Sequence, residues 1–175
     1  QGQDKHLAGI LAETGVSVII VVNKWDLIPD KTTTSVNDYE KLIRAYLPPL
    51  KYAPVIFTSG LNGKRVQDLF PLIDTTFQSR FTQLSDEEAT SFISQAISRH
   101  KPSRGKGVMH PHITKFFQAR ANPPSFVLTV NLSRKDSLND SYLRFLENLL
   151  REHYNFIGTP IRLRVSATRK SHTTY

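Results

Sequence analysis

Hydrophobic residues in the first half of the chain alternate between helix-like and strand-like spacing. Leu7, Ile10 and Leu11 recur at the i, i+3, i+4 interval of one buried helical stripe, which Gly15 ends. An unbroken, mostly β-branched run follows over residues 16–22. Such a run predicts a strand buried on both faces, as in a parallel sheet covered by helices.

A second helix, a second strand and a third helix continue this pattern. Ser35 and Asp38 form an S-x-x-D capping signature before a helical repeat that two prolines stop. Residues 54–58 predict a strand, and residues 66–77 predict a helix that Pro71 shortens or kinks near its first turn. The order is typical of an α/β sheet, and because two strands are too few for such a sheet, we expect further strands upstream.

The second half of the chain predicts a small α+β unit. Ser85 and Glu88 form a capping box at the start of an amphipathic helix. The later predicted elements are strands over 113–120 and 126–131, a helix that opens at Ser137 or Asn139 and ends at Gly158, and a strand over 161–165. The last strand alternates apolar and basic residues, which indicates one exposed, positive face. The predicted order is αββαβ.

These patterns predict a partial α/β unit over residues 1–82, an α+β unit over 85–168 and a basic tail over 169–175. Charge follows the same division, because residues 1–85 are nearly neutral and residues 86–175 carry most of the formal net charge of +8. A basic half favours a polyanionic partner such as nucleic acid. Surface cations that only confer solubility are the alternative.

Composition excludes several classes of protein. The 175 residues contain no cysteine, which rules out disulfides, a thiol nucleophile and cysteine-based zinc sites, and is compatible with a reducing, cytoplasmic location. No apolar run is long enough for a membrane span, so we expect no membrane partner. Met109 is the only methionine and the chain starts at Gln1, so we expect a fragment whose N-terminal part is missing.

Candidate chemistry follows the first predicted strand. Asn23, Lys24 and Asp26 form an N-K-x-D tetrapeptide at the carboxyl edge, where open α/β sheets bind ligands. The Asp26 carboxylate can accept two parallel hydrogen bonds from the N1–H and exocyclic amine of guanine, an arrangement that adenine lacks. Asn23 would brace the loop and reach the far side of the base, and the Lys24 stem would lie over the ring. A simple helix cap is the alternative for Asp26.

A second signal follows the second strand, where Ser59 and Gly60 offer backbone N–H groups for the guanine carbonyl oxygen. The chain contains neither G-x-x-x-x-G-K-[ST] nor D-x-x-G, so it has no loop to cradle phosphates and no hydroxyl placed for magnesium. We therefore expect that this chain alone neither binds GTP tightly nor hydrolyses it, and no catalytic residue is assigned to it.

The two loops resemble the fourth and fifth guanine-nucleotide motifs of the P-loop GTPases, NKxD and SA, with Gly60 where that family usually has alanine. NKWDL, NPPSFVLTVN, SYLRFLENLLRE and GTPIRLRV extend the resemblance, over essentially the whole chain, to the C-terminal part of the bacterial double-GTPase family Der, also called EngA. The family's guanine-binding positions then fall on Asn23, Lys24, Asp26, Ser59 and Gly60.

The resemblance implies a fold, a cofactor and partners. It implies the end of a second G domain followed by a KH-like domain, in a protein with two G domains in tandem. It further implies that the full-length protein binds and hydrolyses GTP with Mg²⁺, passes through a GDP state and associates with the large ribosomal subunit precursor or its ribosomal RNA.

The basic half lacks the usual RNA clamp of KH domains. The G-x-x-G of that clamp is absent after residue 85, and the copy at residues 60–63 lies in the α/β part. RNA contact is therefore expected from basic side chains, with a solvated face as the alternative. These are Arg104, Lys106, Arg134, Lys135 and Arg169. Of Phe116 and Phe117, which could stack on bases, at least one is expected in the core.

His110 and His112 are too few for a metal site, because no cysteine or carboxylate pair is near. We therefore expect no metal bound to this chain.

Two other interpretations of function remain open. One is an Era-like GTPase, although the KH domain of that family carries the G-x-x-G that this chain lacks. The other is a stand-alone KH-like module that binds RNA or protein without a nucleotide. A P-loop in the upstream reading frame would favour a GTPase, and a start codon just before Gln1 would favour the module.

Overall fold

The computed structural model describes residues 2–29, 32, 34–102, 111–131 and 138–167. The chain forms two compact units. Unit 1 comprises residues 1–81 together with 156–160, and unit 2 comprises residues 82–155 together with 161–175.

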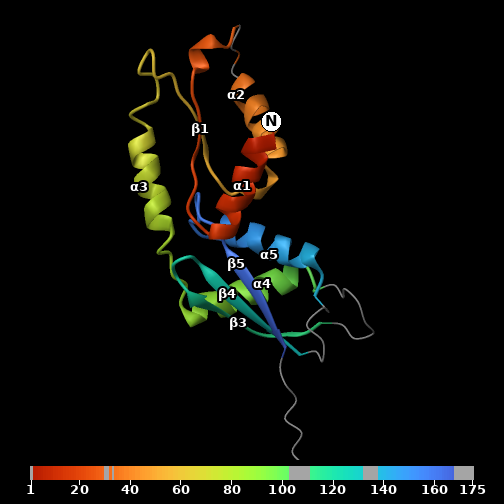
Figure 1. Cartoon of the computed structure of the whole chain (residues 1–175). Helices are drawn as coiled ribbons and strands as arrows, with labels where there is room; N and C mark the ends of the chain where they lie inside the picture. The colour runs from red at the N-terminus through yellow and green to blue at the C-terminus, as the bar shows by residue number, and fades with distance from the viewer. Residues whose placement is uncertain (1, 30–31, 33, 103–110, 132–137, 168–175) are drawn as a thin grey trace, which may run out of the picture. The chain divides into compact units, whose positions relative to one another are not determined.

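Unit 1 is built on two parallel strands. Its elements in chain order are α1 (Gly2–Thr14), β1 (Ile20–Val22), the 3-10 helix η1 (Trp25–Leu27), α2 (Ser35–Tyr46), the 3-10 helix η2 (Pro48–Leu50), β2 (Val55–Phe57) and α3 (Leu69–Ser79). β1 and β2 pair from Ile20↔Val55 to Val22↔Phe57. Figure 1 shows α1 and α2 on one side of these strands and α3 on the other. The α/β order predicted from the sequence is confirmed.

The predicted burial of the first strand and first helix is wrong in detail. The strand covers only Ile20–Val22 instead of residues 16–22, and Val21 is 45% exposed. Leu7 and Ile10 of α1 are exposed as well, and the buried position of that helix is Ala8. These side chains are exposed because few elements pack over them: in the part of the chain that the structure describes, β2 is the only strand that pairs with β1.

The start of α2 also differs from its predicted cap. Ser35 is the first residue of the helix and Thr34 is the N-cap, with no side-chain capping bond. The Ser35 hydroxyl instead accepts a hydrogen bond from the Thr32 N–H at 3.0 Å. Thr34 already has helical backbone angles, so the helix begins one residue earlier than the S-x-x-D signature predicts. Ser35 is then inside the helix and cannot act as its N-cap.

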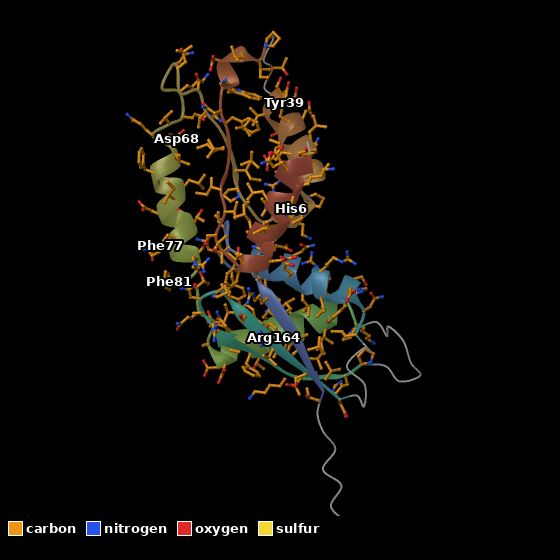
Figure 2. The ribbon with its side chains drawn as sticks, in the orientation of Figure 1. His6, Tyr39, Asp68, Phe77, Phe81 and Arg164 are labelled. Atoms are coloured by element: carbon orange, nitrogen blue, oxygen red, sulfur yellow. The ribbon has the colours of Figure 1, made fainter. Side chains whose placement is uncertain are left out.

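Pro71 lies at the third position of α3, where its missing N–H has no helical partner to lose. The helix accordingly begins at Leu69, later than the apolar pattern indicates. Its buried residues are Thr76 and Ser79, whereas its aromatic residues are exposed. Figure 2 labels Phe77 of α3 and Phe81, two residues beyond the helix; both rings are exposed and their centroids lie 5.2 Å apart.

Residues 156–160 pack within unit 1, although the sequence pattern gives no sign of this return. The Val18 N–H donates to the Gly158 carbonyl at 2.9 Å, and the Gly158 N–H donates to the Tyr52 carbonyl at 3.2 Å. The Ser79 hydroxyl donates to the Ile157 carbonyl at 2.6 Å. The segment therefore joins the chain before β1, the chain before β2 and the end of α3.

Gly158 does not end a helix as predicted. The helix before it ends at His153, and Gly158 has a φ of +63° within the returning segment. A Cβ atom at this position would lie 2.6 Å from Thr76 Cγ2 and 2.9 Å from the Val18 carbonyl oxygen. Both the positive φ and the close approach of the neighbouring backbone require glycine here.

Unit 2 has the predicted αββαβ order. Its elements are α4 (Asp86–Arg99), β3 (Ile113–Arg120), β4 (Ser125–Val130), α5 (Asp140–His153) and β5 (Arg162–Ala167). β4 is the central strand, antiparallel to β3 and parallel to β5. The capping box of Ser85 and Glu88 is present, and Asn139 caps α5 by accepting from the Ser141 N–H at 3.0 Å.

The core of unit 2 lies between the sheet and its two helices. Phe116 and Phe126 stack with centroids 5.4 Å apart, and Phe92 of α4 lies 5.4 Å from Phe116. Leu146 and Leu150 of α5 are fully buried. In Figure 1, α4 passes behind the strands, which leaves the front of the sheet open. Phe116 is thus in the core, as expected for one of the two adjacent phenylalanines, and Phe117 is half-buried.

Candidate functional site

The loops that follow β1 and β2 lie side by side. The Thr58 N–H donates to the Val22 carbonyl at 2.9 Å, and the Trp25 N–H donates to the Thr58 carbonyl at 3.0 Å. These bonds continue the parallel ladder past the ends of the strands. Because neighbouring parallel strands end at the same edge, the two sequence motifs meet at one site.

Asn23 ties the two motifs together. Its Oδ1 atom accepts from the Gly60 N–H at 3.0 Å and from the Thr58 hydroxyl at 3.4 Å. A Cβ atom on Gly60 would lie 3.6 Å from the same oxygen, an ordinary contact, so alanine also fits this position. Thr58 also helps to join the two loops, through its hydroxyl and its backbone, a role that the sequence motifs did not predict.

The expected backbone donors are engaged within the chain. The Gly60 N–H binds Asn23, and the Ser59 N–H donates to the Lys64 carbonyl at 3.0 Å. A bond from Gly60 to a ligand carbonyl therefore requires the Asn23 amide to turn. The net cost of this change is small, because the Gly60 N–H exchanges one oxygen acceptor for another.

Asp26 is oriented by Ser59. The Ser59 hydroxyl donates to Asp26 Oδ1 at 2.5 Å, and the same hydroxyl oxygen accepts from the Asn62 N–H at 3.3 Å. Ser59 is 2% exposed, whereas Asp26 is only half-buried. A buried hydroxyl bonded to a carboxylate holds that carboxylate in one orientation, which is what a bidentate contact to a planar base needs.

A buried tryptophan anchors the first loop. Trp25 packs against Phe57 and Tyr39, with ring centroids at 4.5 Å and 5.2 Å. Lys24, directly before it, has a φ of +61° and is exposed. The sharp turn at Lys24 buries the indole and leaves the neighbouring polar side chains at the surface.

A cavity of about 380 Å³ opens between the loops. Its polar lining includes Asn23, Lys24 and Asp26, and its apolar lining includes Leu27 and Leu61. These leucines are 69% and 85% exposed. Sequence reasoning did not assign them a role, although each lies next to a motif. A slot with polar groups at one edge and apolar walls suits a planar heterocycle.

The site offers side chains that can contact a base, and the sequence contains no motif that holds phosphates. The Asp26 carboxylate, the Asn23 amide and the apolar walls of Leu27 and Leu61 converge from the two loops, and this set of groups fits a guanine base. No phosphate-cradling motif occurs in the sequence. Among the described residues, no group of three or more His, Cys, Asp or Glu side chains can hold a metal ion.

Several expectations fall outside the described residues. These are the five cations expected to contact RNA, Arg104, Lys106, Arg134, Lys135 and Arg169, together with His110. His112 is described and is exposed. None of the described helices is long and apolar enough to cross a bilayer.

Comparison with known families and proteins bears on the choice between the two GTPase interpretations. Residues 83–165 match the model described as "KH-domain-like of EngA bacterial GTPase enzymes, C-terminal", and residues 1–79 match the elongation factor Tu GTP-binding domain. Curated relatives named GTPase Der include those of Pelotomaculum thermopropionicum, 40% identical over 160 residues, Natranaerobius thermophilus, 37% over 161, and Lactobacillus johnsonii, 38% over 164.

These alignments cover 91–92% of this chain but only 36% of each relative, so the chain spans about a third of their length. The matches favour Der over the Era-like interpretation. The chain belongs to the Der (EngA) family of GTPases, and its residues 83–165 correspond to the C-terminal KH-like domain of that family.

Proposed function

We propose that this chain supplies the guanine-reading loops and the RNA-contacting KH-like unit of a GTPase that acts in assembly of the large ribosomal subunit. The observation that carries the nucleotide part is the hydrogen bond from Ser59 to Asp26, together with that from Gly60 to Asn23. Ser59 follows Asp26 by 33 residues and Gly60 follows Asn23 by 37, yet these bonds hold the two motifs side by side. In our proposal the space between them takes the base. The name of the relatives, GTPase Der, supports the same activity.

In this proposal, unit 1 is the end of a second G domain, and the loop that cradles the phosphates lies outside this chain. Bound Mg²⁺ would neutralise the phosphate charge that develops during hydrolysis of GTP. The residues of this chain select and orient the base. Asp26 accepts from the N1–H and the exocyclic amine, Leu27 and Leu61 exclude water from the ring faces, and Asn23 holds the loops together.

Unit 2 would contact ribosomal RNA or the large subunit precursor. Its match to the KH-like domain of EngA and its excess of basic residues support this part of the proposal. The absence of cysteine agrees with action in the cytoplasm.

Base selectivity of the full-length protein tests the proposal. Asp26→Asn replaces an acceptor with a donor, so affinity for GDP should fall by about a hundredfold or more while affinity for xanthosine diphosphate rises. Asp68→Asn is the matched control, because Asp68 is exposed and its side chain makes no capping bond at α3. Unchanged selectivity in Asp26→Asn, measured by competition against a fluorescent nucleotide, would refute the assignment.

A further inference from the structure

The sheet of unit 2 has one covered face and one open face. Along β4, Phe126, Leu128 and Val130 are buried, while the alternate residue Val127 is only half-buried. Side chains of neighbouring strands that pair in register lie on the same face. Val127 pairs with Phe117 of β3 and with Arg164 of β5, so these three side chains form one row across the open face.

Cations surround this row. Arg120 and Arg162 both pair with Ser125 of β4, which places them in the adjacent row. Lys115 lies two residues from Phe117 on the same strand, and its Nζ atom is 4.9 Å from the centre of the Phe117 ring. All four cations are exposed. Figure 2 labels Arg164 on β5, in front of the helices.

The sheet itself adds no acidic side chain to the open face. The three strands contain no aspartate or glutamate. Within the described ranges, the ion pairs of unit 2 join Arg99 to Glu152 and Arg151 to Glu147, and none involves Lys115, Arg120 or Arg164. The strands therefore bring a net positive charge to the open face.

An aromatic ring among these cations narrows the class of partner. Single-stranded RNA is bound on open sheets by bases that stack on aromatic side chains while cations hold the phosphates. Arg162 and Arg164 are two residues apart on one strand, so they project about 6.6 Å apart along it and can follow an extended backbone. The carboxylate side chains of an acidic peptide would use the charges but supply no aromatic ring to stack on Phe117.

We propose that the open face of the β3–β4–β5 sheet binds single-stranded RNA, with phosphates on Lys115, Arg120, Arg162 and Arg164 and a base stacked on Phe117. This inference rests on the RNA part of the proposed function and gives it a surface. The surface is separate from the basic side chains that the sequence first suggested, and it needs no G-x-x-G loop.

The test uses the complete 175-residue chain and a fluorescent dodecauridylate RNA, with affinity measured by anisotropy between about 50 and about 200 mM salt. Arg164→Ala should weaken binding several-fold and reduce the slope of log K against log salt by about 0.7, the contribution of one phosphate contact to a single strand. Arg144→Ala is the matched control. Arg144 is equally an exposed arginine outside the described ion pairs, but it lies on α5.

The aromatic contact has its own signature. Phe117→Leu should weaken RNA binding by roughly fivefold or more without changing the salt slope, because stacking releases no counterions. Phe117→Tyr keeps the ring and should restore affinity. Thermal unfolding of each variant shows that the sheet remains folded, and the tyrosine variant keeps the test valid if leucine perturbs packing.

Four outcomes overturn the inference. Equal losses in Arg164→Ala and Arg144→Ala would mean that binding is spread over the whole charged surface. Binding of a labelled oligoglutamate as tightly as the RNA, with no effect of Phe117→Leu, would identify an acidic protein partner. RNA binding that persists in both sheet variants would leave the proposed RNA function intact on another surface, whereas no RNA binding by the chain would contradict both.

Discussion

The Ser59 hydroxyl donates a hydrogen bond to the Asp26 carboxylate across the two loops of unit 1. Asp26 follows β1 and Ser59 follows β2, so this bond exists only when both strands are paired. It also fixes the plane of the carboxylate. The orientation of Asp26 therefore depends on the parallel strand pair, and its contribution to binding can be probed at Ser59 without changing the carboxylate.

Ser59→Ala should weaken guanine nucleotide binding by the full-length protein without altering base preference. Loss of a hydrogen bond to a charged group costs about 1.5–3 kcal/mol, which corresponds to roughly 10- to 150-fold in affinity. Titration with fluorescent GDP and with xanthosine diphosphate measures both quantities. A shift toward xanthine, as expected for Asp26→Asn, would contradict an orienting role for Ser59.

Gly158→Ala should destabilise unit 1. The residue has a φ of +63°, and an added Cβ would meet Thr76 Cγ2 at 2.6 Å and the Val18 carbonyl at 2.9 Å. The left-handed backbone and the overlap together should lower the free energy of unfolding by about 2 kcal/mol or more. Urea unfolding measures the change. Gly9→Ala in α1 is a control for which the opposite sign is expected. An added Cβ at Gly9 meets no atom within 4 Å, and alanine favours the helix over glycine, so the free energy of unfolding should rise by about 0.5–1 kcal/mol.

Ser85→Ala should destabilise unit 2 by about 1 kcal/mol. The Ser85 hydroxyl accepts from the Glu88 N–H at 3.1 Å, and the Glu88 carboxylate accepts from the Ser85 N–H at 2.7 Å. Removal of the hydroxyl leaves one helical N–H without its capping acceptor. Ser94→Ala, in the same helix, removes only a local bond to the Thr90 carbonyl and should change stability by less than about 0.5 kcal/mol. Equal effects of the two substitutions on chemical unfolding would contradict the capping role.

Tyr142 should make unit 2 sensitive to alkaline pH. Its ring is 1% exposed, its hydroxyl has no hydrogen-bond partner within the described ranges, and burial raises the pKa of Tyr142 from 10.0 to about 12. Between these values the unfolded chain has released the proton that the native state retains. The free energy of unfolding therefore falls as pH rises, by at most about 1.4 kcal/mol per pH unit.

Tyr142→Phe removes both the proton and the unsatisfied hydroxyl. The variant should be at least as stable as the wild type near neutral pH, because a buried hydroxyl without a partner contributes no net stabilisation. It should lose less stability than the wild type between about pH 9 and about pH 11.5, a window set by the pKa values of Tyr142. Denaturant unfolding at both pH values gives the difference, and an equal loss in the two proteins would show that Tyr142 does not cause it.

Local signals predicted the elements of unit 2 well. The capping box at Ser85, the alternation of β5 and the start of α5 at Asn139 all describe interactions within a few residues, and the structure shows each of them. The same local reasoning failed at Ser35, where the signature is present but the helix starts one residue earlier than a cap requires. The S-x-x-D pattern names residue types only, and it does not specify the backbone angles of Thr34, which decide where the helix begins.

The candidate site was only partly predictable. The N-K-x-D and Ser59–Gly60 motifs pointed to one strand edge, because parallel strands end together. The engagement of the Gly60 N–H by Asn23 was not predictable, since it depends on the distance between two loops 37 residues apart in sequence. Leu27 and Leu61 became candidate walls only when their exposure was known.

The order of helices and strands, the position of the two motifs and the basic character of the second half could all be predicted from the amino-acid sequence. These follow from periodicity, caps and composition, which are properties of neighbouring residues. Three features emerged only from the folded chain: Gly158 returns to unit 1, Val21 stays exposed, and Lys115, Phe117 and Arg164 share one open face. Each of these depends on contacts or coverage between distant segments, and strand register and packing set them.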